Sequence, residues 1–483
     1  MNRPFSAFRA NARDHRASIL VAALSSAFGV ALLSSTGVLT AYISHSDVAA
    51  HGSVLVALSV VAVIFFIIAV YVGAIVTTNT FATIIAGRTR TIALLRLIGS
   101  SARAQRRSVA SEGLAVGLLG AVLGGAVSAA LTLVAVRLFV AAGVLPDVLY
   151  PVITPVLLAP LAVVVFTTWL ASWVGSRRVL TVTPVQALGA AEERPAAQVR
   201  ASRGRVVVAV LLMVVGALLL VFGLLLGLGV FARPADSLLS SLGPYGVLIA
   251  LPGGVLSFTG VILAAPLFMP GVLRAVGLLF GRGTAARLAA ANAVRNPERS
   301  SRTTIGLVIG VTLITMFVVA SQSYLQMIQR AQESEPGLYG GVDGVLTVTM
   351  AVFTVLIGFS AVIAAVGVVN SLSLSVLQRR RELGLLRALG FSAGQVRRMI
   401  LAESAQLTFA AIVTGLMLGT LYGWIGAQSL LGAIPGGGLL VPELPWPFLG
   451  LVILAAAILA VTASVAPTRR ATAVAPVAAL AVD

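Results

Sequence analysis

The chain has 483 residues, of which 59% are hydrophobic and 10% are charged, and its mean hydropathy is +1.05. Soluble globular proteins carry about 25% charged residues, so this composition excludes that class and predicts a polytopic membrane protein. The net charge of +18 does not indicate a nucleic-acid partner, because the arginines lie in clusters between apolar runs, as membrane topology requires.

An α-helix needs about 20 apolar residues to cross the hydrocarbon core of a bilayer, and ten apolar runs are long enough. We therefore expect an all-α protein with ten transmembrane helices. In chain order the runs are 19–42, 53–86, 114–141, 152–174, 206–231, 245–279, 305–324, 346–377, 400–430 and 448–465.

The distribution of arginine predicts the orientation of these helices. With both termini in the cytoplasm, 30 of the 33 basic residues fall in cytoplasmic segments, as the positive-inside rule requires. The three exceptions are Arg137, Arg233 and Arg330. The outer loops are then short, and none is long enough for a folded outer domain.

Two residue types are absent, and each absence excludes a kind of site. All 33 basic residues are arginine, whereas the phosphate-binding loop of ATPases needs a lysine after its glycines. The chain is therefore not expected to be an enzyme that hydrolyses ATP. It also has no cysteine, which excludes disulfides and thiolate metal sites. We expect this chain to bind no cofactor and no metal.

Residues 79–112 have a near copy at 370–403, in which twelve of 34 positions are identical without gaps. A second pair of similar segments follows the fourth and tenth expected helices: "RRVLTVTPVQAL" at 177–188 and "RRATAVAPVAAL" at 469–480. These repeats predict two four-helix units in parallel orientation, joined by a two-helix insert. The predicted boundaries are 1–190 for the first unit, 191–284 for the insert and 285–483 for the second unit.

Each copy of the repeat predicts a short amphipathic helix, a tight turn and the start of the next helix at the cytoplasmic surface. Gly99 and Gly390 suit the left-handed C-cap of the short helix. Ser101 and Ser392 suit the N-cap of the helix that follows. A helix that only rests on lipid headgroups is one reading of this pattern. The duplication favours a docking device for a partner with two similar faces.

The segment "RRRELGLLRALGFSAGQVRRMILAE" at 379–403, with the ending "RR-x5-P-x2-AL" of both units, strongly resembles the FtsX-like (MacB-like) ABC transporter permeases of the mechanotransmission class. The resemblance covers both four-helix units. It implies a multi-pass permease of the bacterial cytoplasmic membrane that binds a separate ABC ATPase, in two copies per chain, with ATP and Mg²⁺ held by that partner. The ATPase-coupling residues that it implies are Arg90, Ile92, Leu94, Leu95, Arg96 and Gly99, and Arg381, Glu382, Leu385, Leu386, Arg387 and Gly390.

The sequence departs from the family pattern in two places. The first copy has Thr91 where the second has Glu382, and Ser100 where the second has Phe391, so equal coupling of the two halves is in question. Ten-helix relatives carry a large outer domain between the seventh and eighth helices, whereas the loop here is short, at 327–344.

Several charged residues near the ends of the helices have two readings each. Glu112 with Arg106 and Arg107, and Glu403 with Arg397 and Arg398, are expected to form interfacial ion pairs, and a proton-coupling role is the alternative. Arg137 is expected to snorkel or to contact an anionic substrate headgroup. His45 and His51 are expected to be solvated, with a metal or haem iron as the alternative.

The resemblance and the short loops favour ATP-driven export or extraction of an amphipathic or hydrophobic substrate from the surrounding lipids. Lipids, antimicrobial peptides (and hence antibiotic resistance), drugs and haem-like molecules all fit. The alternative is a signalling or hydrolase-regulating ABC module that moves no substrate. An ion-coupled secondary transporter ranks last, because the repeat is parallel and the centres of the helices lack acidic residues.

Overall fold

The computed structural model describes most of the chain as long helices. The described residues are 16–44, 99–143, 145–176, 203–231, 245–279, 297–336, 385–434 and 438–455, with shorter pieces between 64 and 94, at 291, between 346 and 365 and at 457–458. Within them, seven helices are long and apolar enough to cross a membrane, which confirms an all-α polytopic membrane protein.

The total of ten spans stays a prediction. The apolar runs at 53–86 and 346–377 lie largely outside the described residues, and the run at 448–465 is described only in part. The described parts of the last two runs contain the shorter apolar helices Thr349–Val362 and Trp446–Ala455.

The chain divides into two compact units. The first unit comprises residues 1–192 and 340–363, and the second comprises 193–339 and 364–483. The two helices of the expected insert therefore group with the second unit, and part of the eighth apolar run groups with the first.

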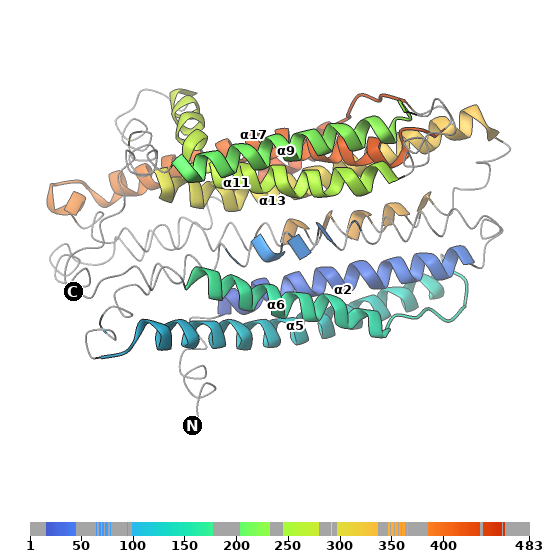
Figure 1. Ribbon diagram of the computed structural model, residues 1–483, viewed down its shortest axis with the longest axis horizontal. Coiled ribbons are helices and arrows are strands. Elements are labelled where there is room, and N and C mark those ends of the chain that lie inside the picture. Colours follow the sequence, from blue (N-terminus) through green and yellow to red (C-terminus); the bar gives the residue numbers. More distant parts are fainter. Residues whose placement is uncertain are drawn as a thin grey trace. The chain divides into compact units, whose positions relative to one another are not determined.

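The first unit contains α2 (Arg16–Ser44), α5 (Ala102–Ala141), the 3-10 helix η2 (Pro155–Leu157) and α6 (Leu158–Gly175), which pack side by side (Figure 1). Glycines on α5 allow this close packing: a Cβ at Gly113 would lie 2.5 Å from the Cβ of Ser172 on α6, and one at Gly124 would lie 1.9 Å from the carbonyl oxygen of Ala23 on α2. Small residues at such contacts let membrane helices approach closely.

The second unit contains α9 (Arg203–Gly227), α11 (Gly246–Leu279), α13 (Pro297–Ser334) and α17 (Ala393–Leu431). Helix α11 contacts the other three, and α13 packs along α17 (Figure 1). The hydroxyls of Ser257 on α11 and Tyr422 on α17 lie 2.8 Å apart, and the Tyr422 ring packs edge-on against Phe258. The two helices of the expected insert, α9 and α11, thus pack against helices of the second repeat.

The end predicted for the seventh helix is wrong. The apolar run ends at Tyr324, but α13 continues to Ser334. Hydropathy identifies the stretch that suits the bilayer core, whereas a helix continues wherever its side chains still find packing partners. Met327 and Ala331 are fully buried in this extension. The first part of the loop expected at 327–344 is therefore helical.

Candidate functional site

The second copy of the repeat forms a tight turn, residues 385–400, which we call the second-unit turn. Residues 385–388 are helical, and Gly390 follows with a φ of +97°. The N–H of Gly390 donates to the carbonyl of Arg387 at 3.1 Å, and the N–H of Phe391 donates to the carbonyl of Leu386 at 3.1 Å. This pair of hydrogen bonds is a Schellman motif, so the left-handed cap predicted at Gly390 is confirmed.

Helix α17 starts immediately after this motif with a complete capping box. The Oγ of Ser392 accepts from the backbone N–H of Gln395 at 3.2 Å, and the side-chain oxygen of Gln395 accepts from the N–H of Ser392 at 2.8 Å. The predicted N-cap is confirmed. Only residues 389–391 separate the end of one helix from the N-cap of the next, and hydrogen bonds fix the backbone on both sides of Phe391.

An apolar cluster joins the short helix to α17. Leu386 packs against Val396, Met399 and Ile400, all three of which are buried. These residues lie in the first two turns of α17. Leu386 therefore faces its own chain, and the short helix packs against the start of α17.

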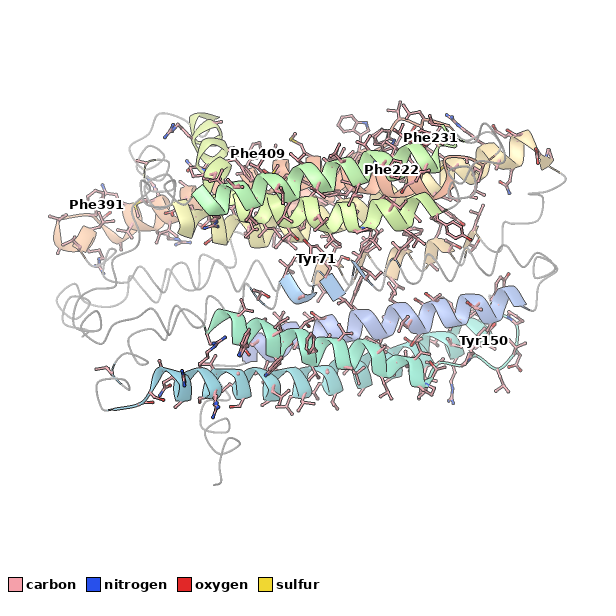
Figure 2. The ribbon with its side chains drawn as sticks, viewed as in Figure 1. Tyr71, Tyr150, Phe222, Phe231, Phe391 and Phe409 are labelled. Atoms are coloured by element: carbon pink, nitrogen blue, oxygen red, sulfur yellow. The ribbon has the colours of Figure 1, made fainter. Side chains whose placement is uncertain are left out.

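The outer side of the same turn exposes large apolar side chains. Leu385, Leu389 and Phe391 are 53%, 69% and 37% exposed. Figure 2 shows Phe391 at the end of the second unit, beside the start of α17. Arg397 and Arg398 are also exposed on the first turns of α17. Large apolar side chains exposed close together along the chain and near charged ones are typical of a protein interaction site.

The first copy of the repeat has a glycine and a serine at the equivalent positions within residues 94–109, which we call the first-unit turn and of which 95–98 lie outside the described residues. Gly99 also has a φ of +97°, and Ser101 is the N-cap of α5, where its Oγ accepts from the N–H of Ala104 at 3.1 Å. The N-cap predicted at Ser101 and the left-handed conformation predicted at Gly99 are confirmed, whereas the short helix that Gly99 is expected to end lies, apart from Leu94, outside the described residues. The side-chain amide of Gln105 donates to the Oγ of Ser100 at 2.8 Å.

The predicted coupling residues are described only in part. Leu94 is 47% exposed, much like Leu385, its counterpart in the second copy. The remaining ones, for which the structure gives no placement, are Arg90, Ile92, Leu95, Arg96, Arg381 and Glu382.

The expected interfacial ion pairs stay a prediction. Glu403 is 7% exposed and Glu112 is half-buried. The guanidinium carbon of Arg106 lies 4.1 Å from the centre of the Trp173 ring. The Nε and Nη2 atoms of Arg106 are buried and make no hydrogen bond, so the described contact of this cation is the aromatic face. The contact joins the start of α5 to the end of α6.

The remaining candidates lie away from the two turns. Arg137 is exposed on α5, one turn before that helix ends at Ala141. This placement suits either snorkelling or contact with a headgroup. His45 and His51 lie outside the described residues.

Sequence reasoning missed four residues that shape these turns. Leu389 adds to the exposed patch, Val396 lies at the centre of the buried cluster, Gln105 bridges the first-unit turn and Trp173 stacks on Arg106. The sequence contained a signal for two of these residues. Gln105 and Val396 occupy the same position of the repeat but differ in polarity. The contact of Trp173 joins separate helices and leaves no local signal.

Comparison with known proteins identifies the part of the chain that carries both turns. The model of the FtsX-like permease C-terminal family matches twice, over residues 63–184 and 354–476. Each match includes one turn and the helix that starts from it. The two matches together cover just over half of the chain.

Three curated proteins are similar over shorter stretches. The uncharacterized ABC transporter permease YknZ of Bacillus subtilis is 30% identical over 20% of this chain and 23% of its own length. The ABC transporter permease YtrF of the same organism is 31% identical over 23% of this chain and 28% of its own length. An uncharacterized ABC transporter permease of Methanocaldococcus jannaschii is 33% identical over 17% of this chain and 19% of its own length. The matches span less than a third of each relative, and it is the duplicated family match that shows that this chain belongs to the FtsX-like permease family.

Proposed function

We propose that the chain is the membrane subunit of an ABC transporter and that separate ATPase subunits dock on its two turns. The observation that carries this proposal is the second-unit turn, where Leu385, Leu389 and Phe391 are exposed on a backbone that hydrogen bonds hold rigidly. A preorganised apolar knob loses little entropy when a partner covers it.

The duplication supports two ATPase copies per chain. Gly99 and Gly390 have the same φ, and both are followed by a serine N-cap. A dimer of ATPase subunits offers two related faces, and two turns of like backbone geometry can occupy them. The lack of lysine in the whole chain supports ATP and Mg²⁺ binding by the partner, because the phosphate-binding loop needs that residue.

The proposed substrate is an amphipathic or hydrophobic molecule taken from the bilayer and exported. The described connections at the end of the units opposite the turns are short: 142–157 joins α5 to α6, and 432–445 follows α17. Neither is long enough for a separate substrate-binding domain. Access from the lipid phase between helices is consistent with this plan. We place the protein in the cytoplasmic membrane with both turns and both termini in the cytoplasm, following the arginine distribution.

The docking proposal is tested by co-purification with an ABC ATPase subunit co-expressed with the permease. The test variant carries Leu385→Ser and Leu389→Ser, and the control is Leu439→Ser, which is 69% exposed beyond the far end of α17. We expect the test variant to lose about tenfold or more of the bound ATPase, because two exposed apolar contacts are removed, and the control to keep it. Equal retention by both variants contradicts the proposal.

The transport proposal needs a separate measurement. The complex of permease and ATPase is reconstituted into vesicles, and its vanadate-sensitive ATP hydrolysis is measured with a series of amphipathic compounds. We expect at least one compound class to change the rate and to be moved across the bilayer. A complex whose hydrolysis no amphipathic compound modulates contradicts export and favours the signalling alternative.

A further inference from the structure

We infer that the two halves of the permease are mechanically unequal, and that ATP-driven movement is transmitted mainly through the second-unit turn into α17. The inference rests on the proposed function for the identity of the driving partner. Its structural basis is a difference in the side chains that join each turn to the helix that follows it.

The difference is concentrated at repeat positions that lie within a few residues of each other. Where the second unit has the apolar residues Phe391, Val396 and Met399, the first has polar ones. Gln395, which completes the capping box of α17, is replaced by alanine. The first-unit residues that correspond to Phe391, Val396, Met399 and Gln395 are, respectively, Ser100, Gln105, Ser108 and Ala104.

In the second unit, side chains before and after the turn pack against each other. Leu386, which comes before Gly390, packs into the buried cluster formed by residues of α17 that come after it. Displacement of the short helix alone would expose that cluster to water, which is unfavourable in proportion to the apolar area. The short helix and α17 are therefore expected to move as one body.

The first-unit turn has different side chains at the equivalent described positions. Gln105 is half-buried, and its side chain is used in a hydrogen bond to Ser100 within the turn itself. Ser108 is exposed and offers no apolar surface. Of the three first-unit positions equivalent to Val396, Met399 and Ile400, only the one occupied by Val109 is apolar.

The start of α5 is instead held by its neighbour. Arg106 stacks on Trp173 near the end of α6, whereas Arg397, its repeat counterpart, is exposed. The first turn of α5 is thus tied to another helix of its own unit, while the first turns of α17 are tied to the short helix. A force that the ATPase applies to the second-unit turn is therefore transmitted to α17. A force applied to the first-unit turn is resisted by the contact between α5 and α6.

The partner is expected to reflect this difference. The face that covers the second-unit turn needs an apolar socket for Phe391, whereas the face that covers the first meets Ser100. The driving ATPase contact is therefore an apolar socket on the subunit below the second unit.

The rigidity is tested on the permease alone by distances between spin labels. The chain has no cysteine, so pairs of introduced thiols can be labelled without background. One pair is Leu385→Cys with Met417→Cys, and the repeat-equivalent pair is Leu94→Cys with Ala126→Cys; all four positions are exposed. We expect a narrow distance distribution in the second unit and a broader one in the first.

Reciprocal substitutions test whether the residue at positions 105 and 396 sets the width of the distance distribution in each unit. Val396→Gln should broaden the second-unit distribution, and Gln105→Val should narrow that of the first unit. Size-exclusion chromatography checks that both variants remain folded, and the second variant, which introduces an apolar residue, keeps the test valid if the first misfolds. Equal widths in the two units, or widths that neither substitution changes, overturn the inference.

The transmission is tested in the complex with the ATPase. Val396 is fully buried and adds no surface to the exposed patch, so Val396→Gln should reduce ATPase co-purification less than Leu385→Ser with Leu389→Ser does, and should lower ATP-driven transport about tenfold, since an unpartnered polar group loosens the cluster. Gln105→Val should not lower transport. If transport falls equally when either turn is altered, the inference is wrong. If no ATPase binds to any variant, the proposed function fails, while the spin-label result still decides the mechanical difference.

Discussion

Gly99 and Gly390 lie in different units of the chain, yet both have a φ of +97° and neither has a neighbouring atom within 4 Å of the position of a Cβ. A side chain at either position would therefore not clash with its surroundings. The left-handed backbone is what requires these glycines, because any L-residue with a side chain is strained in that conformation. The repeat preserves a backbone geometry at both positions, while the side chains around it differ.

A first prediction follows for Gly390→Ala. The substitution should cost about 1–2 kcal/mol through backbone strain alone, and the turn should open more often as a result. The measurement is hydrogen exchange at residues 389–391, where we expect about tenfold faster exchange. Gly390→Asn should show a smaller effect, because asparagine tolerates the left-handed region better. Unchanged exchange in the alanine variant would contradict the Schellman geometry.

A second prediction compares the two N-caps. Ser392 takes part in a reciprocal capping box, whereas Ser101 accepts a single hydrogen bond from Ala104. Loss of an N-cap serine costs about 1 kcal/mol, and Ser392→Ala combined with Gln395→Ala, which removes both hydrogen bonds of the box, should cost more than Ser101→Ala, which removes one. Hydrogen exchange over the first turns of α17 and α5 measures the difference. A larger effect at Ser101 would show that the box adds nothing.

The caps could be predicted from the sequence because they depend on residues that are neighbours along the chain. The direction in which Leu386 faces could not. Leu385 and Leu386 are adjacent and both apolar, and only the angle at the turn decides that Leu386 contacts α17 while Leu385 is exposed. That angle depends on the whole motif from Arg387 to Gln395, which periodicity within one short helix does not contain.

Helix ends show the same distinction. Ser101 and Ser392 predict where α5 and α17 begin, because each N-cap has a local signature. The end of α13 at Ser334 was missed because its last turns are polar in composition and are held by the burial of Met327 and Ala331. A residue that is buried beyond the bilayer core is not recognised by hydropathy, which registers only the composition of a window.

A third prediction concerns the contact between Arg106 and Trp173. A cation over an indole face contributes about 0.5–2 kcal/mol, so Arg106→Ala and Trp173→Leu should show a coupling energy of that size in a double-mutant cycle. The measurement is the free energy of unfolding of the single and double variants in detergent. Additive effects would mean that the two residues act separately.

A fourth prediction addresses the topology on which the proposed function depends. Leu149 is 97% exposed in the connection between α5 and α6, and Leu389 is exposed at the second-unit turn. In the cysteine-free chain, Leu149→Cys should react with a membrane-impermeant maleimide on intact cells, whereas Leu389→Cys should react only after the membrane is permeabilised. The reverse pattern would place the turns outside the cell and exclude contact with an intracellular ATPase.

A fifth prediction tests how the insert is fastened to the second unit. A Cβ on Gly253 of α11 would lie 2.7 Å from the backbone nitrogen of Leu220 and 2.8 Å from the carbonyl oxygen of Gly216, both on α9. Gly253→Ala therefore forces the two helices apart and should lower the free energy of unfolding by about 1–3 kcal/mol.

The same helix offers a matched control for this substitution, because Gly253 and Gly271 both follow a proline on α11, and a Cβ at Gly271 would meet nothing within 4 Å. Gly271→Ala should be neutral or slightly stabilising, since alanine has the higher helix propensity. Thermal unfolding of both variants in the same detergent separates close packing from helix propensity. Equal loss in the two variants would mean that the proline-glycine steps themselves matter, whereas a loss confined to Gly253→Ala assigns the effect to the contact between α9 and α11.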